Sequence, residues 1–151
     1  MTNKYFKYFI FLLPIIMIIN CSDIFDSEDN QEGLENTYNY TAFDSTGRKI
    51  VTGTMELQFT KIDSVDKERI SGRWSFSAAN DSGIPQAMLG DGELIGEWHP
   101  DTRLWLNLHP NMMDNNVFLD GNLENEKYTG EWSYATFAGV INYGTFEASK
   151  K

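Results

Sequence analysis

The side chains that could bind a metal ion or catalyse a reaction are few and scattered along this sequence. The two histidines, His99 and His109, have no further ligands at the spacing of a zinc site. Asp114, Asn115 and Asn116 offer oxygens without the ligand spacing of a calcium loop, so they are interpreted as a turn. The sequence has no Cys/His cluster, glycine-rich phosphate loop or Ser/His/Asp order. We therefore expect no metal, no cofactor and no catalytic residue.

The positions of the acidic side chains also disfavour a catalytic function. Four glutamates fall on the polar side of alternating segments: Glu56, Glu93, Glu97 and Glu131. A catalytic pair needs carboxyl groups whose surroundings move their pKa values apart, and solvated carboxylates lack such surroundings. We expect these glutamates to face water and to contribute solubility.

The single thiol belongs to Cys21, which ends a segment laid out like a secretory signal. Lys4 and Lys7 precede the apolar run 9–19. This run is too short to span a bilayer, for which about 20 residues are needed. One cysteine cannot form an internal disulfide, and lipid attachment at Cys21 would consume a thiol that is otherwise a liability outside the cytoplasm.

The residues Ile18-Ile19-Asn20-Cys21 resemble the lipobox of bacterial lipoproteins, with Asn20 where Gly, Ala or Ser is usual. The resemblance implies that residues 1–20 are a signal peptide, and that Cys21 takes a diacylglycerol thioether, with acyl chains such as palmitate, and becomes the mature N-terminus. The alternatives are a plain signal peptide and an uncleaved anchor. Residues 21–35 follow as an acid-rich stretch, whose low hydrophobicity and high charge predict a disordered tether.

The acid-rich stretch after the cysteine resembles the export signal that sends lipoproteins of Bacteroidota to the outer face of the outer membrane. Surface-exposed and periplasm-facing locations both stay open. Without residues 1–20, which hold two lysines and no acid, 10 basic side chains face 22 acidic ones, so the net charge changes from −10 to −12. Nucleic-acid binding needs basic clusters and is excluded as a function. We expect a monomer that contacts the membrane through its lipid.

From residue 36 to 149 apolar and polar residues alternate with the period of half-buried strands. The clearest run is 51–59, and similar runs follow up to 144–148 with turn residues between them. Eight such segments in one domain predict an all-β fold, an eight-stranded antiparallel up-and-down meander that closes into a small β-barrel. A β-sandwich is the alternative.

Three segments repeat an apolar-x-Gly-x-Trp pattern: 70–74, 94–98 and 128–132. They resemble the Gly-x-Trp strand of small calycin-like barrels, the lipocalins and avidins, which normally carry it once. The resemblance implies a barrel whose lumen is either filled or holds one small apolar ligand. The candidate lumen residues are Trp74, Trp98, Trp132 and Tyr134.

Two aromatic residues interrupt the polar side of their strands and define a second candidate surface. Pairing across the loop 110–115 sets Trp105 opposite Asp120 and Asn107 opposite Phe118. Rings, an amide and a carboxylate on a rigid sheet are typical of a sugar-stacking or protein-docking surface.

The sequence therefore predicts a lipid-anchored envelope protein whose barrel is a binding module for a protein or a glycan. The alternatives are a structural or assembly factor of the envelope, and a lipocalin-like carrier of a small apolar ligand.

Overall fold

The computed structural model of the protein describes residues 36–62, 67–80, 83–99 and 103–151. Cys21, the expected signal peptide and the expected tether lie outside these residues. The elements in chain order are β1 Asn36–Asp44, β2 Lys49–Lys61, β3 Glu68–Ala78, the 3-10 turn η1 Gln86–Met88, β4 Gly90–Trp98, β5 Arg103–Asn107, β6 Asn116–Glu124, β7 Lys127–Thr136 and β8 Gly139–Lys150. In the described part of the chain, no helix has the length and hydropathy needed to cross a membrane.

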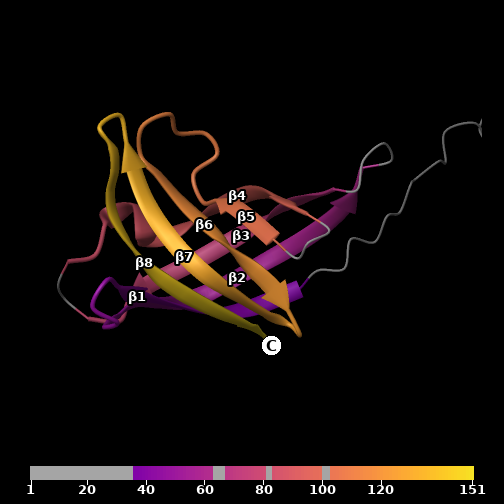
Figure 1. The fold of residues 1–151 in the computed structure, drawn as a ribbon, viewed down its shortest axis with the longest axis horizontal. Coiled ribbons are helices and arrows are strands. Elements are labelled where there is room, and N and C mark those ends of the chain that lie inside the picture. Colours follow the sequence, from indigo (N-terminus) through magenta and orange to yellow (C-terminus); the bar gives the residue numbers. More distant parts are fainter. Residues whose placement is uncertain (1–35, 63–66, 81–82, 100–102) are drawn as a thin grey trace, which may run out of the picture. The chain divides into compact units, whose positions relative to one another are not determined.

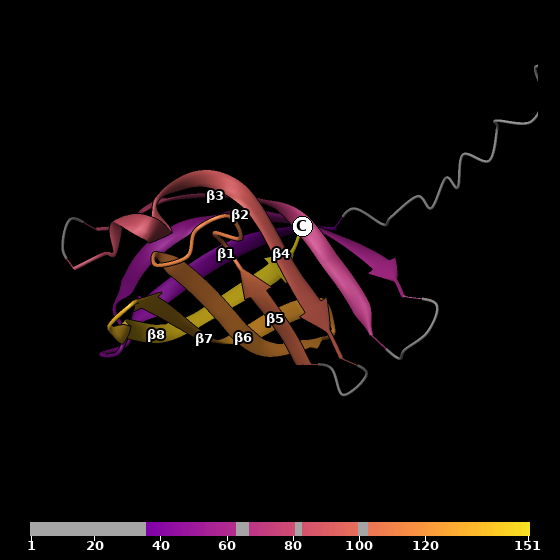
Figure 2. The same ribbon diagram turned by 90° about the horizontal axis from the view of Figure 1, so that it is seen from above.

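The eight strands form a closed antiparallel barrel (Figures 1 and 2). Each strand pairs with the next, and β8 returns to pair with β1 from Tyr38↔Lys150 to Asp44↔Gly144. The predicted meander and its closure are confirmed, and the sandwich alternative is wrong. Because neighbouring strands are antiparallel, the β1 start and the β8 end lie at the same end of the barrel as the β2–β3, β4–β5 and β6–β7 connections. The other four connections lie at the opposite end.

The barrel interior is an apolar core to which every strand contributes. Met55 and Leu57 on β2 are fully buried, whereas Glu56 between them is exposed, as the alternation predicts. The remaining fully buried large side chains include Ile70, Leu94, Leu104, Leu106, Leu119, Tyr128 and Trp132. Among the described residues no polar or charged one is buried. The fold is therefore stabilised mainly by the transfer of these side chains out of water.

The glycines of the three Gly-x-Trp segments lie where two strands approach too closely for a side chain. A Cβ atom at Gly72 would stand 1.9 Å from the carbonyl oxygen of Glu56, and one at Gly96 would stand 2.1 Å from that of Trp105. At Gly130 the carbonyl oxygen of Asp120 would be 2.1 Å away. The sequence places each of these glycines two residues before a tryptophan on the same face, which predicts that an added side chain would collide with a packed ring. That prediction is wrong about the obstacle, because the nearest atoms belong to the backbone of the neighbouring strand.

The buried indole rings are accommodated by other glycines, which lie directly across from them. Trp74 pairs with Gly92 on β4, and Trp132 pairs with Gly144 on β8. A Cβ atom at Gly92 would lie 3.0 Å from Trp74 Nε1. One at Gly144 would lie 2.7 Å from Trp132 Nε1, and also 2.0 Å from the carbonyl oxygen of Phe43 on the neighbouring strand. Each ring thus occupies space that a side chain on the next strand would otherwise fill.

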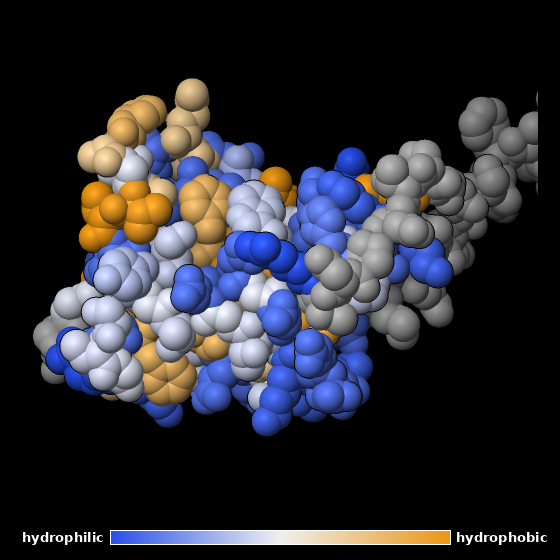
Figure 3. Space-filling view, viewed as in Figure 1, coloured by the Kyte–Doolittle hydropathy of each residue, from blue (hydrophilic) through white to orange (hydrophobic). Residues whose placement is uncertain are grey.

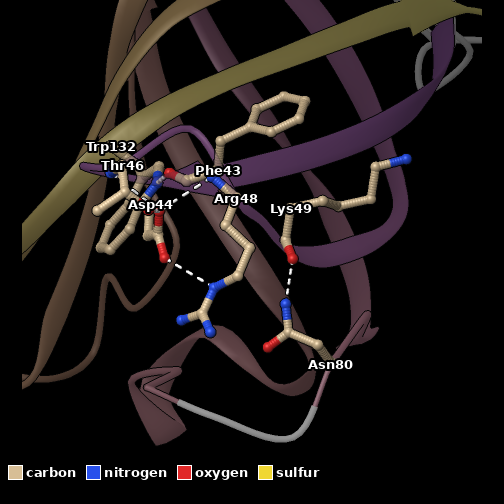
Figure 4. Close-up of polar contacts among 7 residues, drawn as sticks. All are labelled: Phe43, Asp44, Thr46, Arg48, Lys49, Asn80 and Trp132. Carbon is tan, nitrogen blue, oxygen red and sulfur yellow. Dashed lines mark hydrogen bonds and ion pairs between the residues drawn. The ribbon is translucent and has the colours of Figure 1, made fainter.

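The β1–β2 turn is held by the carboxylate of Asp44 (Figure 4). Asp44 accepts hydrogen bonds from the Thr46 hydroxyl and backbone N–H and from the Arg48 backbone N–H, and it pairs with Arg48 Nε at 3.0 Å. The bonds from Thr46 and Arg48 lower the pKa of Asp44 to about 2. Asn80 also donates to the carbonyl oxygen of Lys49 beside this turn. The connection is therefore fixed by local polar contacts rather than by burial.

Gly96→Val should lower the unfolding midpoint clearly, because the new side chain would overlap the Trp105 carbonyl. Overpacking a filled core costs about 1–3 kcal/mol, and a backbone obstacle places this variant at the upper end of that range or beyond it. The matched control is Glu97→Gln on the next, outward-facing position, for which thermal melts should show almost no change. Equal midpoints for the two variants would contradict the observed close approach of β4 and β5.

Candidate functional site

The candidate surface on the barrel exterior is the outer patch, which we define as Trp105, Asn107, Phe118 and Asp120. Strand register places Trp105 opposite Asp120 and Asn107 opposite Phe118, as the sequence predicted. The side chains of all four lie on the outer face, because their neighbours Leu104, Leu106, Val117 and Leu119 are fully buried. The patch is thus built on two paired strands rather than on a loop.

The two rings of the outer patch stack on each other. The centroids of Trp105 and Phe118 lie 5.5 Å apart with an angle of 23° between the ring planes. Trp105 keeps 36% of its surface exposed. Such a pair is rigid, so a ligand that covers it loses little side-chain entropy on binding.

One polar member of the patch carries an ion pair that the sequence analysis missed. Arg103 Nε and Nη2 contact Asp120 Oδ1 and Oδ2 at 2.9 and 2.6 Å. A bidentate pair of this kind fixes both side chains. The alternation of Arg103, Trp105 and Asn107 along β5 was the signal that could have identified Arg103, because residues two apart share a face.

The amide of Asn107 is partly engaged within its own chain segment. Its Oδ1 accepts the backbone N–H of His109 at 2.9 Å, whereas its amide nitrogen has no hydrogen-bond partner among the residues that the structure describes. On the other side of β5, Ile95 and Glu97 pair with Asn107 and Trp105 and extend the same face onto β4. Ile95 is exposed, so the apolar surface continues past the patch.

An open groove of about 480 Å³ adjoins the outer patch on the exterior of β2, β3 and β4 and ends at Ile95. Three charged residues line the groove. Arg73 on β3 pairs with Glu56 on β2 and with Glu93 on β4, so it lies between the two glutamates. None of these three side chains forms an ion pair with another described residue. Gln58 and Ser71 add an amide and a hydroxyl to the same lining. The groove thus offers hydrogen-bond donors and acceptors that are free to meet a polar ligand.

The candidate lumen residues point into the barrel, where protein groups engage three of them. Trp74 Nε1 donates to the carbonyl oxygen of Leu108 at 2.9 Å, and Trp132 Nε1 donates to that of Phe43 at 2.8 Å. The Tyr134 hydroxyl lies 2.6 Å from Asn115 Oδ1. Two of the rings, Trp74 and Trp132, are buried.

Trp98 differs from the other three lumen candidates. It lies at the end of β4, only partly buried, with its ring edge-on to Phe59 at 6.3 Å. Its buried Nε1 has no hydrogen-bond partner among the described residues. The hydroxyl of Tyr40, deep in the lumen, also lacks a partner there, and burial raises its pKa far above the usual value. The Tyr40 ring stacks on Phe76 with centroids 4.1 Å apart, so side chains occupy the space around it.

His109 and the segment 114–116, whose last residue begins β6, make structural contacts. His109 Nε2 lies 2.6 Å from the carbonyl oxygen of Ala87, and its ring packs edge-on against Trp74. Asn116 donates to the carbonyl oxygen of Met112 at 2.9 Å. Across the described ranges, no three His, Cys, Asp or Glu side chains are grouped so that they could hold a metal ion.

The chain matches no family model, no curated protein and no solved structure in comparisons with known proteins. The resemblance to calycin-like barrels therefore rests on the eight-stranded barrel architecture and, in the sequence, on the Gly-x-Trp segments alone. Any function must be argued from the chain's own residues.

Trp105→Ala and Trp132→Ala should differ strongly in stability. Trp105 stands on the barrel exterior, so its truncation removes mainly the stack on Phe118 and should lower the free energy of unfolding by only about 0.5–1.5 kcal/mol. Trp132 is fully buried, and truncation of a buried Trp typically costs 3–5 kcal/mol. Denaturant unfolding of both variants measures the difference. A large loss for Trp105→Ala would show that its ring belongs to the core.

Proposed function

We propose that this protein is an exported, lipid-anchored envelope protein whose barrel is a non-catalytic binding module for a glycan. The observation that carries the proposal is the stacked pair of exposed Trp105 and half-buried Phe118, which lies on the outside of the sheet and is flanked by Asn107 and Asp120. Aromatic rings cover the apolar C–H faces of a sugar, while amides and carboxylates bind its hydroxyl groups.

The groove beside the outer patch favours a glycan over a protein partner. Arg73, Glu56 and Glu93 offer charges of both signs and form no ion pair within the described part of the chain. A neutral polyhydroxylated chain can donate to the carboxylates and accept from the guanidinium without adding charge. Extended ligands can also cross from the groove over Ile95 to the outer patch, because these surfaces adjoin.

The two alternatives receive less support. An envelope assembly factor would dock a protein on the same outer patch, and the interface would have to leave the polar groove unused. A carrier of a small apolar ligand would need room in the lumen, where buried rings pack against one another and Trp74 and Trp132 are tied to backbone carbonyls.

The anchor and the location rest on the sequence. The only cysteine follows an apolar leader, and the acid-rich stretch after it resembles a surface export signal. An envelope location puts a glycan-binding module next to its ligand, on either face of the outer membrane.

Cys21→Ser should move the protein from the membrane fraction to the soluble fraction, because lipid chains anchor in proportion to their buried methylenes. Mass spectrometry of the wild-type protein should show the mass of the attached lipid on Cys21. An unmodified Cys21, with unchanged membrane partitioning of the serine variant, would show that the lipobox interpretation is wrong.

Affinity electrophoresis in gels that contain a neutral polysaccharide (starch, mannan or xylan) tests the glycan proposal. We expect at least one of them to retard the wild-type protein and Trp105→Ala to weaken that binding by about thirtyfold, the equivalent of the ~2 kcal/mol of an interface hot spot. Tyr143→Ala is the matched control, because Tyr143 is an exposed aromatic residue outside the outer patch. It should bind like the wild type.

The contrary result is specific. The glycan proposal would be contradicted if the wild-type protein migrated freely in every gel and an envelope protein co-purified with the wild type but not with Trp105→Ala. That result would show that the outer patch binds a protein.

A further inference from the structure

The exposed apolar side chains of the barrel fall into two groups. Among the described residues eight large apolar side chains are exposed. Two of them, Trp105 of the outer patch and Ile95 beside it on β4, belong to the proposed glycan-binding surface. The other six form a second group, the apolar tip, which consists of Met112, Met113, Phe137, Val140, Ile141 and Tyr143. The exposed fraction reaches 79% for Phe137 and 89% for Met113. Neither core packing nor the outer patch accounts for the apolar tip.

The apolar tip lies at the end of the barrel opposite to Asn36. It is formed by the β5–β6 loop and the β7–β8 hairpin, which Figure 1 shows at the same end, and Figure 3 shows apolar surface gathered there. The hydroxyl of Tyr134 on β7 bonds to Asn115 in the β5–β6 loop at 2.6 Å. This contact holds the loop beside the hairpin, so the two parts form one surface.

The hairpin also projects beyond its neighbour strand. Pairing between β8 and β1 ends at Asp44↔Gly144, whereas β8 continues to pair with β7 as far as Gly139. Val140, Ile141 and Tyr143 therefore stand on a two-stranded extension of the barrel wall. This convex shape differs from the flat sheet of the outer patch.

Charge is absent from this extension in a strongly acidic chain. No Asp, Glu, Lys or Arg occurs from residue 132 to residue 146, although the chain holds 22 acidic and 12 basic side chains. Between Arg103 and Asp120, the only charged side chain in the sequence is that of Asp114.

We propose that the apolar tip inserts into the interfacial region of a lipid bilayer. A convex, uncharged hairpin with aliphatic side chains and a tyrosine suits the boundary between head groups and acyl chains, where aromatic residues with a polar end are enriched. A protein interface would instead use hydrogen bonds at about one per 100–200 Å², and the six side chains of the tip supply a single hydroxyl. Because the hairpin projects beyond β1 and holds no charged residue, its insertion leaves the acidic side chains of the barrel wall away from anionic lipids.

Stable membrane binding of the tip depends on the lipid anchor at Cys21, which is part of the proposed function. Residues 22–35 can extend at most about 46–50 Å, at 3.3–3.6 Å per residue. The longest strand, β2, has 13 residues and spans about 43 Å at 3.3 Å per residue. The tip can therefore reach the membrane that holds the lipid, and tethering raises the effective concentration of that membrane enough for a weak insertion to matter.

Site-directed fluorescence on the processed, lipidated chain in zwitterionic phosphatidylcholine vesicles tests the proposal. If lipid consumes Cys21, Ile141→Cys supplies the only free thiol, which can be labelled with an environment-sensitive dye. We expect emission at shorter wavelength and quenching by lipids with a spin label on the acyl chain. Thr129→Cys, at an exposed position toward the other end of the same hairpin, is the matched control. A dye at this position should keep the emission wavelength that it has in water. Adding Phe137→Asp to Ile141→Cys should lower the ratio of inserted to free tip at least about tenfold, the equivalent of ~1.4 kcal/mol.

Each other outcome has one meaning. A dye at position 141 that reports water in vesicles overturns the inference, and self-association of the chain without vesicles would assign the tip to a second copy instead. Labelling of the wild-type chain would show a free Cys21 and hence a failed anchor. The tip is then tested with Ile141→Cys in a Cys21→Ser background, so the two failures are distinguishable.

Discussion

Closure of a small barrel around large rings is the constraint on which the rest of this structure depends. Trp74 and Trp132 fit inside because the positions across from them are Gly92 and Gly144, which leave the space that the rings fill. Each indole then donates its one hydrogen to a distant backbone carbonyl, that of Leu108 just after β5 or that of Phe43 on β1. Each ring thus combines apolar burial with a satisfied polar group, which a buried Trp needs.

A second set of glycines lets neighbouring strands curl together closely enough for that closure. Gly72, Gly96 and Gly130 each face a carbonyl oxygen of the adjacent strand at a distance that no Cβ atom tolerates. Strong curvature of this kind closes the sheet, and closure removes the unpaired edges that an open sheet would expose to aggregation. Packed rings then occupy the interior, so binding surfaces are expected on the exterior.

The two exposed apolar surfaces, the outer patch and the apolar tip, lie at different places on the barrel. The outer patch around Trp105 lies on the paired strands β5 and β6 beside a polar groove, whereas the apolar tip around Ile141 is centred on a projecting hairpin without charged residues. Acidic side chains such as Glu131 and Glu147 occupy other parts of the exterior. A protein anchored at one end of its chain can thus present one surface to a membrane and another to a soluble or polymeric ligand, and the two surfaces need not compete.

The sequence by itself determined the strands, their order, and which of their side chains point into the barrel. The period-two alternation fixes which side chains point inward, and the short turns pair consecutive strands, so even the register of Trp105 with Asp120 followed from the spacing. These features are local, because each depends on residues close in the chain. The partners of the glycines, the ion pair of Arg103 and the union of the β5–β6 loop with the β7–β8 hairpin are not local. They depend on the curvature of the closed sheet, which brings together backbone and side-chain groups far apart in the sequence, and only the tertiary structure decided them.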